Sequence, residues 1–245
     1  RQILALYIFL LLCGTVSAQQ IVEWSDLQTI TDNSRRTVYY KKGRKQPLRG
    51  KYRIIRGLDE ECVKFSVGMI NGDYRRYRDG VLRESGIYAK GKRNSTFTEY
   101  YQDGVTPRKE TPMQQGKIDG TVKTYFRNGK IEAEKEYKQS VESGRERRFD
   151  SKTGEQIFES HYIDGKKDGE EWEIFEDAST LRSRIIRHYR NGKLDGSYRV
   201  ESTRDGKPYI TIEGQYTDGE KSGQWIEHNY DNNTQTCTWH GEGGA

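Results

Sequence analysis

The segment Tyr162-Ile163-Asp164-Gly165-Lys166-Lys167-Asp168-Gly169 contains the pattern that decides the fold of this 245-residue chain. A large side chain, here called the anchor, is followed three residues later by a small residue and four positions further by a second one. The pattern occurs seven times at spacings of 23 to 27 residues, and internal periods of about 20 to 50 residues are typical of stacked repeats. The seven anchors are Phe65, Tyr88, Met113, Tyr137, Tyr162, Tyr189 and Tyr216.

The small residues predict structural turns, because glycine adopts backbone conformations that other residues avoid. A second turn follows in five copies, where Asp, Asn or Thr precedes glycine, and such pairs suit tight hairpin connections. These pairs are Asp79-Gly80, Asp103-Gly104, Asn128-Gly129, Thr153-Gly154 and Asp205-Gly206. The small residues at the first position are Gly68, Gly91, Gly116, Ser140, Gly165, Gly192 and Gly219, and those at the second are Gly72, Ser95, Gly120, Gly144, Gly169, Gly196 and Gly223.

Between the second turn and the next anchor, the side chains alternate with the period of a β-strand. Ile131, Ala133, Lys135 and Tyr137 fall on one face, while the glutamates between them fall on the other. Each copy is therefore expected to form one β-hairpin, with a bulge or bend in its first strand. The prediction is an all-β solenoid of stacked antiparallel hairpins, with seven to eight units of 23 to 27 residues.

The ends of the chain differ from the repeats. Residues 3–12 are almost wholly apolar and precede Val16-Ser17-Ala18, a pattern typical of a signal peptide cleaved after Ala18. We therefore expect residues 1–18 to be a signal peptide and the protein to be exported, as a periplasmic, outer-envelope-associated or secreted protein. Residues 19–36 are expected to form a linker or an N-terminal cap, 37–240 a single repeat domain that begins with an irregular unit, and 241–245 a tail.

Composition argues against a thick globular core. Only 32% of the residues are hydrophobic and the mean hydropathy is -1.04, which leaves little aliphatic surface to bury. Removal of residues 1–18 leaves Cys62 and Cys237. Seven hairpins would hold these two residues about 65 Å apart in a straight stack, too far for a disulfide. Both thiols are expected to be free and buried.

The sequence contains no motif of a catalytic site or a cofactor site, so we expect no enzymatic activity, no cofactor and no small-molecule substrate. His161 and His188 occupy equivalent positions of neighbouring units, roughly 10 Å apart, which is too far to share a metal ion. Glu132, Glu134 and Glu136 are expected to be solvated, with Lys130 and Lys135 offsetting their charge. Basic residues in Tyr74-Arg75-Arg76-Tyr77-Arg78 and between Arg35 and Lys45 leave binding to an anionic membrane or glycan surface open, whereas nucleic acid is not expected as a partner.

The aromatic residues are the remaining candidates for a binding site. The anchors are expected to pack the hairpins, because a large flat side chain covers a thin sheet where aliphatic residues are scarce. A second set follows the second small residue by two or three positions, and it could either pack or bind a protein partner. This set comprises Tyr74, Phe97, Trp172, Tyr198 and Trp225, whereas Glu146 stands in this position after the anchor Tyr137.

These repeats resemble the MORN repeat and, more closely, bacterial MORN-repeat variants of the YwqK-family antitoxin type. The segment Tyr162 to Gly169, followed by Trp172 and Phe175, matches the family unit with one extra residue before the tryptophan. The copies anchored at Tyr189 and Tyr216 match nearly as well. The resemblance implies a β-hairpin solenoid that contacts proteins or membrane surfaces without catalytic residues. A protein-interaction or envelope-associated scaffold is therefore expected, with an inhibitor of a partner toxin as the alternative.

Overall fold

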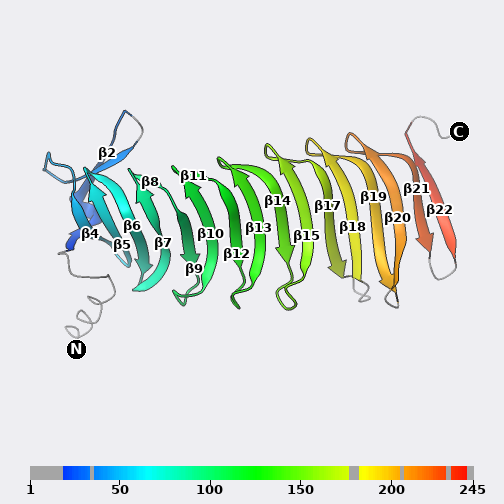
Figure 1. Ribbon diagram of the computed structural model, residues 1–245, viewed down its shortest axis with the longest axis horizontal. Helices are drawn as coiled ribbons and strands as arrows, with labels where there is room; N and C mark the ends of the chain where they lie inside the picture. The colour runs from blue at the N-terminus through cyan, green and yellow to red at the C-terminus, as the bar shows by residue number, and fades with distance from the viewer. Residues whose placement is uncertain (1–18, 34–35, 177–181, 205–206, 230–232, 242–245) are drawn as a thin grey trace. The chain divides into compact units, whose positions relative to one another are not determined.

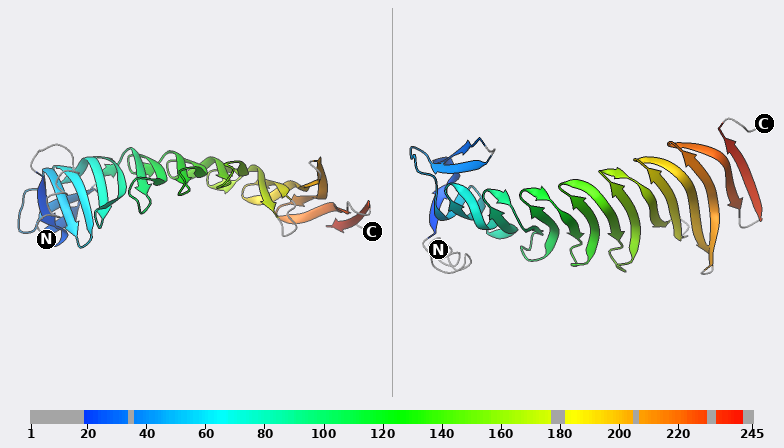
Figure 2. Two further views of the ribbon diagram at one scale, coloured as in Figure 1. Left: turned by 90° about the horizontal axis from the view of Figure 1, so that it is seen from below. Right: turned by 45° about the horizontal axis from the view of Figure 1, so that its top comes forward.

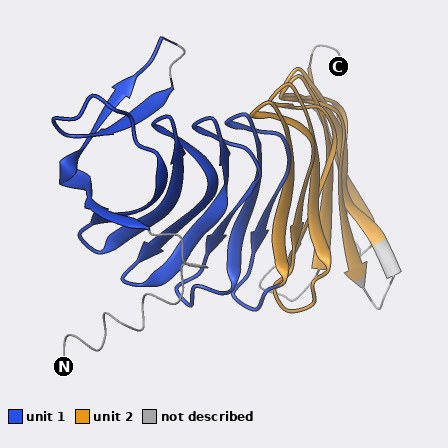
Figure 3. Ribbon diagram, turned by 60° about the vertical axis from the view of Figure 1, so that its left-hand side comes forward, with its two compact units in different colours: residues 1–129 blue, residues 130–245 orange. Residues whose placement is uncertain are grey.

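The computed structural model describes residues 19–33, 36–176, 182–204, 207–229 and 233–241. The prediction of an all-β fold built from successive hairpins is confirmed, because most strands belong to one largely antiparallel 20-stranded sheet (Figure 1). None of the helices in these residues is long and apolar enough to cross a membrane. The chain divides into two compact units, residues 1–129 and 130–245 (Figure 3).

Unit 1 contains a three-residue 3-10 helix and twelve strands in its described part. The helix, η2, spans Trp24–Asp26, and β1 pairs with β4 in parallel, whereas β4 to β7 follow one another in antiparallel order. The strands are β1 (Gln20–Glu23), β2 (Leu27–Thr31), β3 (Thr37–Lys41), β4 (Gly50–Arg56), β5 (Asp59–Ser66), β6 (Met69–Arg78), β7 (Val81–Ala89), β8 (Lys92–Arg93), β9 (Thr96–Tyr100), β10 (Pro107–Gln114), β11 (Lys117–Ile118) and β12 (Gly120–Tyr125).

Unit 2 consists of strands that pair with their neighbours in sequence, each pairing antiparallel. The strands are β13 (Ile131–Lys138), β14 (Val141–Phe149), β15 (Gln156–Ile163), β16 (Lys166–Lys167), β17 (Gly169–Glu176), β18 (Arg182–Arg190), β19 (Lys193–Arg204), β20 (Lys207–Thr217), β21 (Glu220–Asn229) and β22 (Thr234–His240). The predicted second turn at residues 205–206 lies outside the described residues.

The two small residues of each repeat have different roles in the backbone. Asp164 and Gly165 have φ values of 48° and 80°, so both central residues of this hairpin turn are left-handed, as a type I′ turn requires. Gly72 has a φ of 113° and lies in the bulge where the β5–β6 register shifts between Val63 and Phe65. Similar shifts occur in β13–β14, β18–β19 and β20–β21, so the predicted bulges are confirmed there.

The described residues of 19–36, for which the sequence left a linker or an N-terminal cap open, belong to unit 1. Val22 on β1 and Leu27 on β2 are buried in the core of the unit, where Trp24 packs against them. The β2–β3 hairpin forms a separate two-stranded sheet that projects from the other strands of unit 1 (Figure 2). The residues of 1–18 and 242–245, to which the sequence assigned a signal peptide and most of a tail, lie outside the described residues.

The cysteines differ from the expectation in one respect. Cys62 on β5 is 9% exposed, whereas Cys237 on β22 is exposed, and neither forms a disulfide in the structure. The prediction that both thiols are buried is therefore wrong for Cys237. The described side chains of β22 are nearly all exposed, because this strand contributes little to the apolar core of unit 2.

Candidate anion-binding cleft

The aromatic residues that the sequence offered as exposed partner contacts are mostly core residues. Tyr74, Phe97 and Trp225 are 6%, 1% and 5% exposed, so of the two roles that the sequence left open for them, packing and binding, the structure supports packing. Tyr198 and Trp172 are half-buried. Three-ring clusters bury Tyr74, Phe97 and Trp225, because one anchor ring packs against the aromatic residue before it and the aromatic residue after it in the chain.

The same cluster forms in both units. In unit 1, the ring of Tyr88 stands edge-on to those of Tyr74 and Phe97, with centroids 5.2 and 5.3 Å apart. In unit 2, Tyr216 relates to Tyr198 and Trp225 in the same way, with centroids 5.7 and 5.2 Å apart. The expectation that anchors pack the hairpins is met most fully by Phe65, which is 2% exposed, whereas the other six anchors are half-buried.

In the first hairpins of unit 2, charged residues occupy the core positions that the second aromatic residues occupy in other repeats. Glu171, not Trp172, occupies the core position, since Glu171 is 2% exposed and lies opposite Arg187. This corrects the alignment that placed an extra residue before Trp172. In the preceding hairpin, Glu146 lies opposite Lys135, whose Nζ is 3.0 Å from Glu146 Oε2 and 2.7 Å from Glu142 Oε1.

These carboxylates are held by cations from adjacent strands. Glu171 forms an ion pair with Lys167 and lies 3.4 Å from the Nε atom of Arg187. Burial raises the pKa of Glu146, but hydrogen bonds from Lys135, Tyr162 and Arg148 outweigh that effect and lower the pKa below its ordinary value. These carboxylates therefore stabilise the sheet through ion pairs with neighbouring strands. Because each has a cation as a partner within the protein, they are not free to bind an external ligand.

The other polar candidates also have local partners. Glu134 pairs with Arg147 at 2.8 Å and is 12% exposed, so it is not the solvated residue that strand alternation suggested. Lys135 binds Glu142 and Glu146 instead of offsetting the charge of Glu134. Among the described residues, His, Cys, Asp and Glu side chains form no group of three or more that could hold a metal ion.

One stretch near the start of the repeats holds many cations and no acidic residue. Between residues 36 and 58 the chain contains nine Lys or Arg residues and no Asp or Glu, and this stretch is here called the basic segment. Its cations are Arg36, Lys41, Lys42, Arg44, Lys45, Arg49, Lys51, Arg53 and Arg56. The basic stretch predicted from the sequence ended at Lys45, and Arg35, with which it began, lies outside the described residues.

Three of the nine cations bind elsewhere within unit 1. Arg36 pairs with Asp32 at 2.7 Å, Arg53 pairs with Glu60 at 2.6 Å, and the guanidinium of Arg56 lies 3.9 Å from the ring centroid of Trp24. The remaining six form no ion pair with any carboxylate in the described part of the chain, and all but Lys41 are exposed. Unit 1 thus presents a concentration of uncompensated positive charge.

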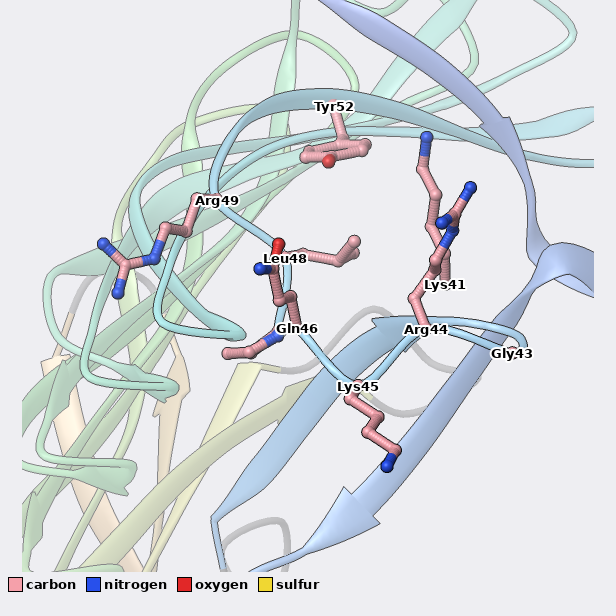
Figure 4. Close-up of a pocket in the computed structure, with 9 residues that line it drawn as sticks. Lys41, Gly43, Arg44, Lys45, Gln46, Leu48, Arg49 and Tyr52 are labelled. Atoms are coloured by element: carbon pink, nitrogen blue, oxygen red, sulfur yellow. The ribbon is translucent and has the colours of Figure 1, made fainter.

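Four of these cations line an open cleft of about 830 Å³. Lys41, Arg44, Lys45 and Arg49 supply the charge, and the lining includes Tyr52 and Leu48 but no Asp or Glu. Figure 4 shows the head groups of Lys41 and Arg44 projecting in the same direction on the side facing Tyr52, while Lys45 and Arg49 extend away from the cleft. The Nζ atom of Lys41 lies 5.8 Å from the ring centroid of Tyr52 and 3.3 Å from the Oε1 atom of Gln20.

Backbone hydrogen bonds fix the loop that carries the cleft. Arg44 N donates to Lys41 O at 3.0 Å, with Gly43 left-handed at a φ of 73°, and Leu48 N donates to Tyr39 O at 2.9 Å. The N–H of Gly68, in the first hairpin turn, donates to Leu48 O at 2.8 Å. The cations are therefore displayed by a loop attached to the repeat framework, and their charge makes the cleft suited to an anionic ligand.

No protein-family model matches this chain, and no curated protein matches it. The geometry of its own side chains is therefore the basis for a functional proposal.

Proposed function

We propose that this protein is an exported, non-enzymatic scaffold of MORN-like hairpin repeats that binds an acidic partner protein through the cleft of unit 1. The single observation that carries the proposal is the set of six cations in the basic segment that have no carboxylate partner among the residues that the structure describes. Like charges held close together repel one another, and an acidic partner relieves that repulsion on binding. Complementary charge also accelerates association and selects among partners.

A protein partner is favoured over a membrane surface by the kind of side chains around the cleft. Membrane-surface segments combine cations with exposed apolar residues that enter the lipid interface. Between Lys41 and Lys51, Leu48 is buried and Pro47 is half-buried, so this part of the segment presents no exposed large apolar side chain. Cations on a concave, polar-rimmed surface are better matched to acidic side chains of another protein.

The test compares two variants of equal net charge. In the cleft variant, Arg44, Lys45 and Arg49 are each replaced by Glu; in the control variant, the exposed residues Lys138, Lys166 and Arg190 of unit 2 are each replaced by Glu. Binding of each protein to poly-glutamate and to vesicles of phosphatidylglycerol is measured at several salt concentrations.

We expect the cleft variant to lose poly-glutamate affinity at least about tenfold and the control variant to lose less than about threefold. Binding of the natural protein should weaken as salt increases, because the charges are exposed. Equal losses in both variants would show a general charge effect and contradict a specific cleft. Binding to vesicles but not to poly-glutamate would replace the protein partner with a membrane.

A further inference from the structure

Within the described residues of unit 1, the β2 strand pairs with one strand, β3, and its other edge is open. β2 and β3 pair antiparallel over all five residues, from Leu27 opposite Lys41 to Thr31 opposite Thr37. Leu27 is buried, but the other four residues of β2 are exposed. In the described residues, β3 is the only strand with which β2 forms a sheet, and the hairpin projects from the other strands of unit 1 in Figure 1.

Two hydrogen bonds outside the strand define which backbone groups face the open edge. Asp32 N donates to Arg36 O and Lys42 N donates to Asp26 O, so the pairs 26–42 and 32–36 are hydrogen-bonded pairs. Bonded and non-bonded pairs alternate along an antiparallel ladder, which assigns Gln28 and Ile30 to the side facing β3. The N–H and C=O groups of Thr29 therefore point away from β3, as do those of Thr31.

This edge lacks the features that protect natural edge strands. Charged residues, proline and bulges normally prevent an exposed edge from pairing with another chain. The sequence of β2, Leu-Gln-Thr-Ile-Thr, contains no charge and no proline, although 32% of the whole chain is charged. Its register with β3 is continuous, without a bulge. The strand is therefore ready to accept an added strand.

The chemistry of the added strand is indicated by the neighbouring charge. Leu27, at the start of β2, lies opposite Lys41, at the start of the cleft loop. A strand added beside β2 would lie two strand spacings, roughly 10 Å, from β3, which ends at Lys41, within a Debye length and the reach of long side chains. Acidic residues at the end of the strand beside Leu27 would meet the cleft cations, whereas basic residues would be repelled.

We propose that β2 binds an extended acidic segment of the partner protein by strand addition, with backbone hydrogen bonds to Thr29 and Thr31. This inference rests on the proposed function, since the cleft of unit 1 supplies the charge that selects the segment. Main-chain hydrogen bonds give such a complex its geometry, and the acidic side chains give it specificity.

The probe is a ten-residue peptide of alternating valine and glutamate, compared with the same peptide methylated on every backbone nitrogen. The protein variants are Thr29→Pro, which removes an outward N–H while keeping the β2–β3 hydrogen bonds, and Thr29→Val, which keeps the backbone donor. Peptide affinity and amide hydrogen exchange of the full chain are measured for each combination, with the cleft variant included.

We expect the unmethylated peptide to slow exchange at Thr29 and Thr31 at least about tenfold, because strand addition protects outward amides. Methylation of the peptide and Thr29→Pro should each weaken binding at least about tenfold, because the cleft charge alone remains, while Thr29→Val retains full binding. Binding that is lost in the cleft variant but unchanged by Thr29→Pro and by methylation would overturn strand addition and leave the proposed function intact. Binding unchanged in the cleft variant would overturn the proposed function itself. The methylated peptide tests the idea even if Thr29→Pro does not fold.

Discussion

Gly214 on β20 lies so close to the indole ring of Trp225 on β21 that a Cβ atom added to the glycine would be 2.3 Å from Cδ2 of the ring. The same relationship occurs in unit 1, where a Cβ added to Gly86 would be 2.7 Å from ring atoms of Phe97. Neither glycine has a positive φ, so space rather than backbone conformation requires glycine here. Each precedes an anchor by two positions, which makes glycine part of the three-ring cluster.

Gly214→Ala is therefore expected to destabilise the protein by about 1–3 kcal/mol, because the rigid indole ring cannot move aside without disturbing its neighbours. Thermal and urea unfolding would measure the change. In a Trp225→Leu background, the same substitution should cost much less, and a double-mutant cycle isolates the coupling. An equal cost in both backgrounds would contradict the close approach.

Glu171→Gln is expected to destabilise the protein by about 3 kcal/mol, because it removes the buried counter-ion of Lys167 and leaves Arg187 with only the half-exposed Glu173. Glu170 on the same strand is the matched control, since it is 49% exposed and only its 3.7 Å contact with His188 is lost. Glu170→Gln should change stability by less than about 0.5 kcal/mol. Urea unfolding measures the free energy of unfolding of both variants. Similar losses in the two would mean that the buried ion pairs of Glu171 contribute little to stability.

The contributions of Glu146 and Glu61 to stability are expected to change in opposite directions with pH. The pKa of Glu146 is lowered from 4.5, so the ionised group stabilises the protein above that pH, and this contribution is lost as pH falls through the lowered value. Burial raises the pKa of Glu61, with a further contribution from Glu84 and Asp59 that Arg56 and Arg76 oppose. Its contribution is most favourable below 4.5 and is lost as pH rises through the raised value.

Near neutral pH, Glu146→Gln should therefore lower the Tm and Glu61→Gln should raise it, and both differences should shrink in acid. Thermal unfolding followed by circular dichroism over a range of pH would record both trends. A Tm change of the same sign in the two variants would show that the assigned pKa directions are wrong for at least one residue.

The two thiols of the chain lacking residues 1–18 should react at very different rates. Cys237 is exposed, whereas Cys62 is buried within the β5 strand. Under native conditions, a maleimide reagent should modify Cys237 rapidly and Cys62 only after unfolding, because reaction requires access to the thiolate. Peptide mapping by mass spectrometry identifies the modified residue, and Cys237→Ser provides the control. Rapid native labelling of Cys62 would contradict its burial.

The hairpins were predictable because their signals are local. The Asp164-Gly165 turn needs only two residues that tolerate positive φ, and the second glycine of each unit marks a bulge only a few residues away. Period-two alternation then identifies the strands on either side. Each of these signals lies within a few residues of the chain, and the same signals recur in seven copies.

The candidate site was predictable only in part, because contacts across the sheet determine which of its cations have an acidic partner. The basic residues up to Lys45 are visible in the sequence, but only the structure shows that Arg53 has the partner Glu60 while Arg49 has no carboxylate partner among the described residues. Ion pairing is a property of residues brought together by strand register, and spacing along the chain does not determine it.

By itself, the sequence determined the all-β hairpin architecture, the position of the turns and the absence of a recognisable catalytic motif. Only the tertiary structure decided that Glu171 rather than Trp172 faces the core, that Phe97 is buried and that Cys237 is exposed. The physical reason is the alternation of a strand, in which a shift of one residue exchanges the two faces. A bulge can introduce that shift. Which side chain is then buried depends on the register with the neighbouring strands, which the sequence of one strand does not contain.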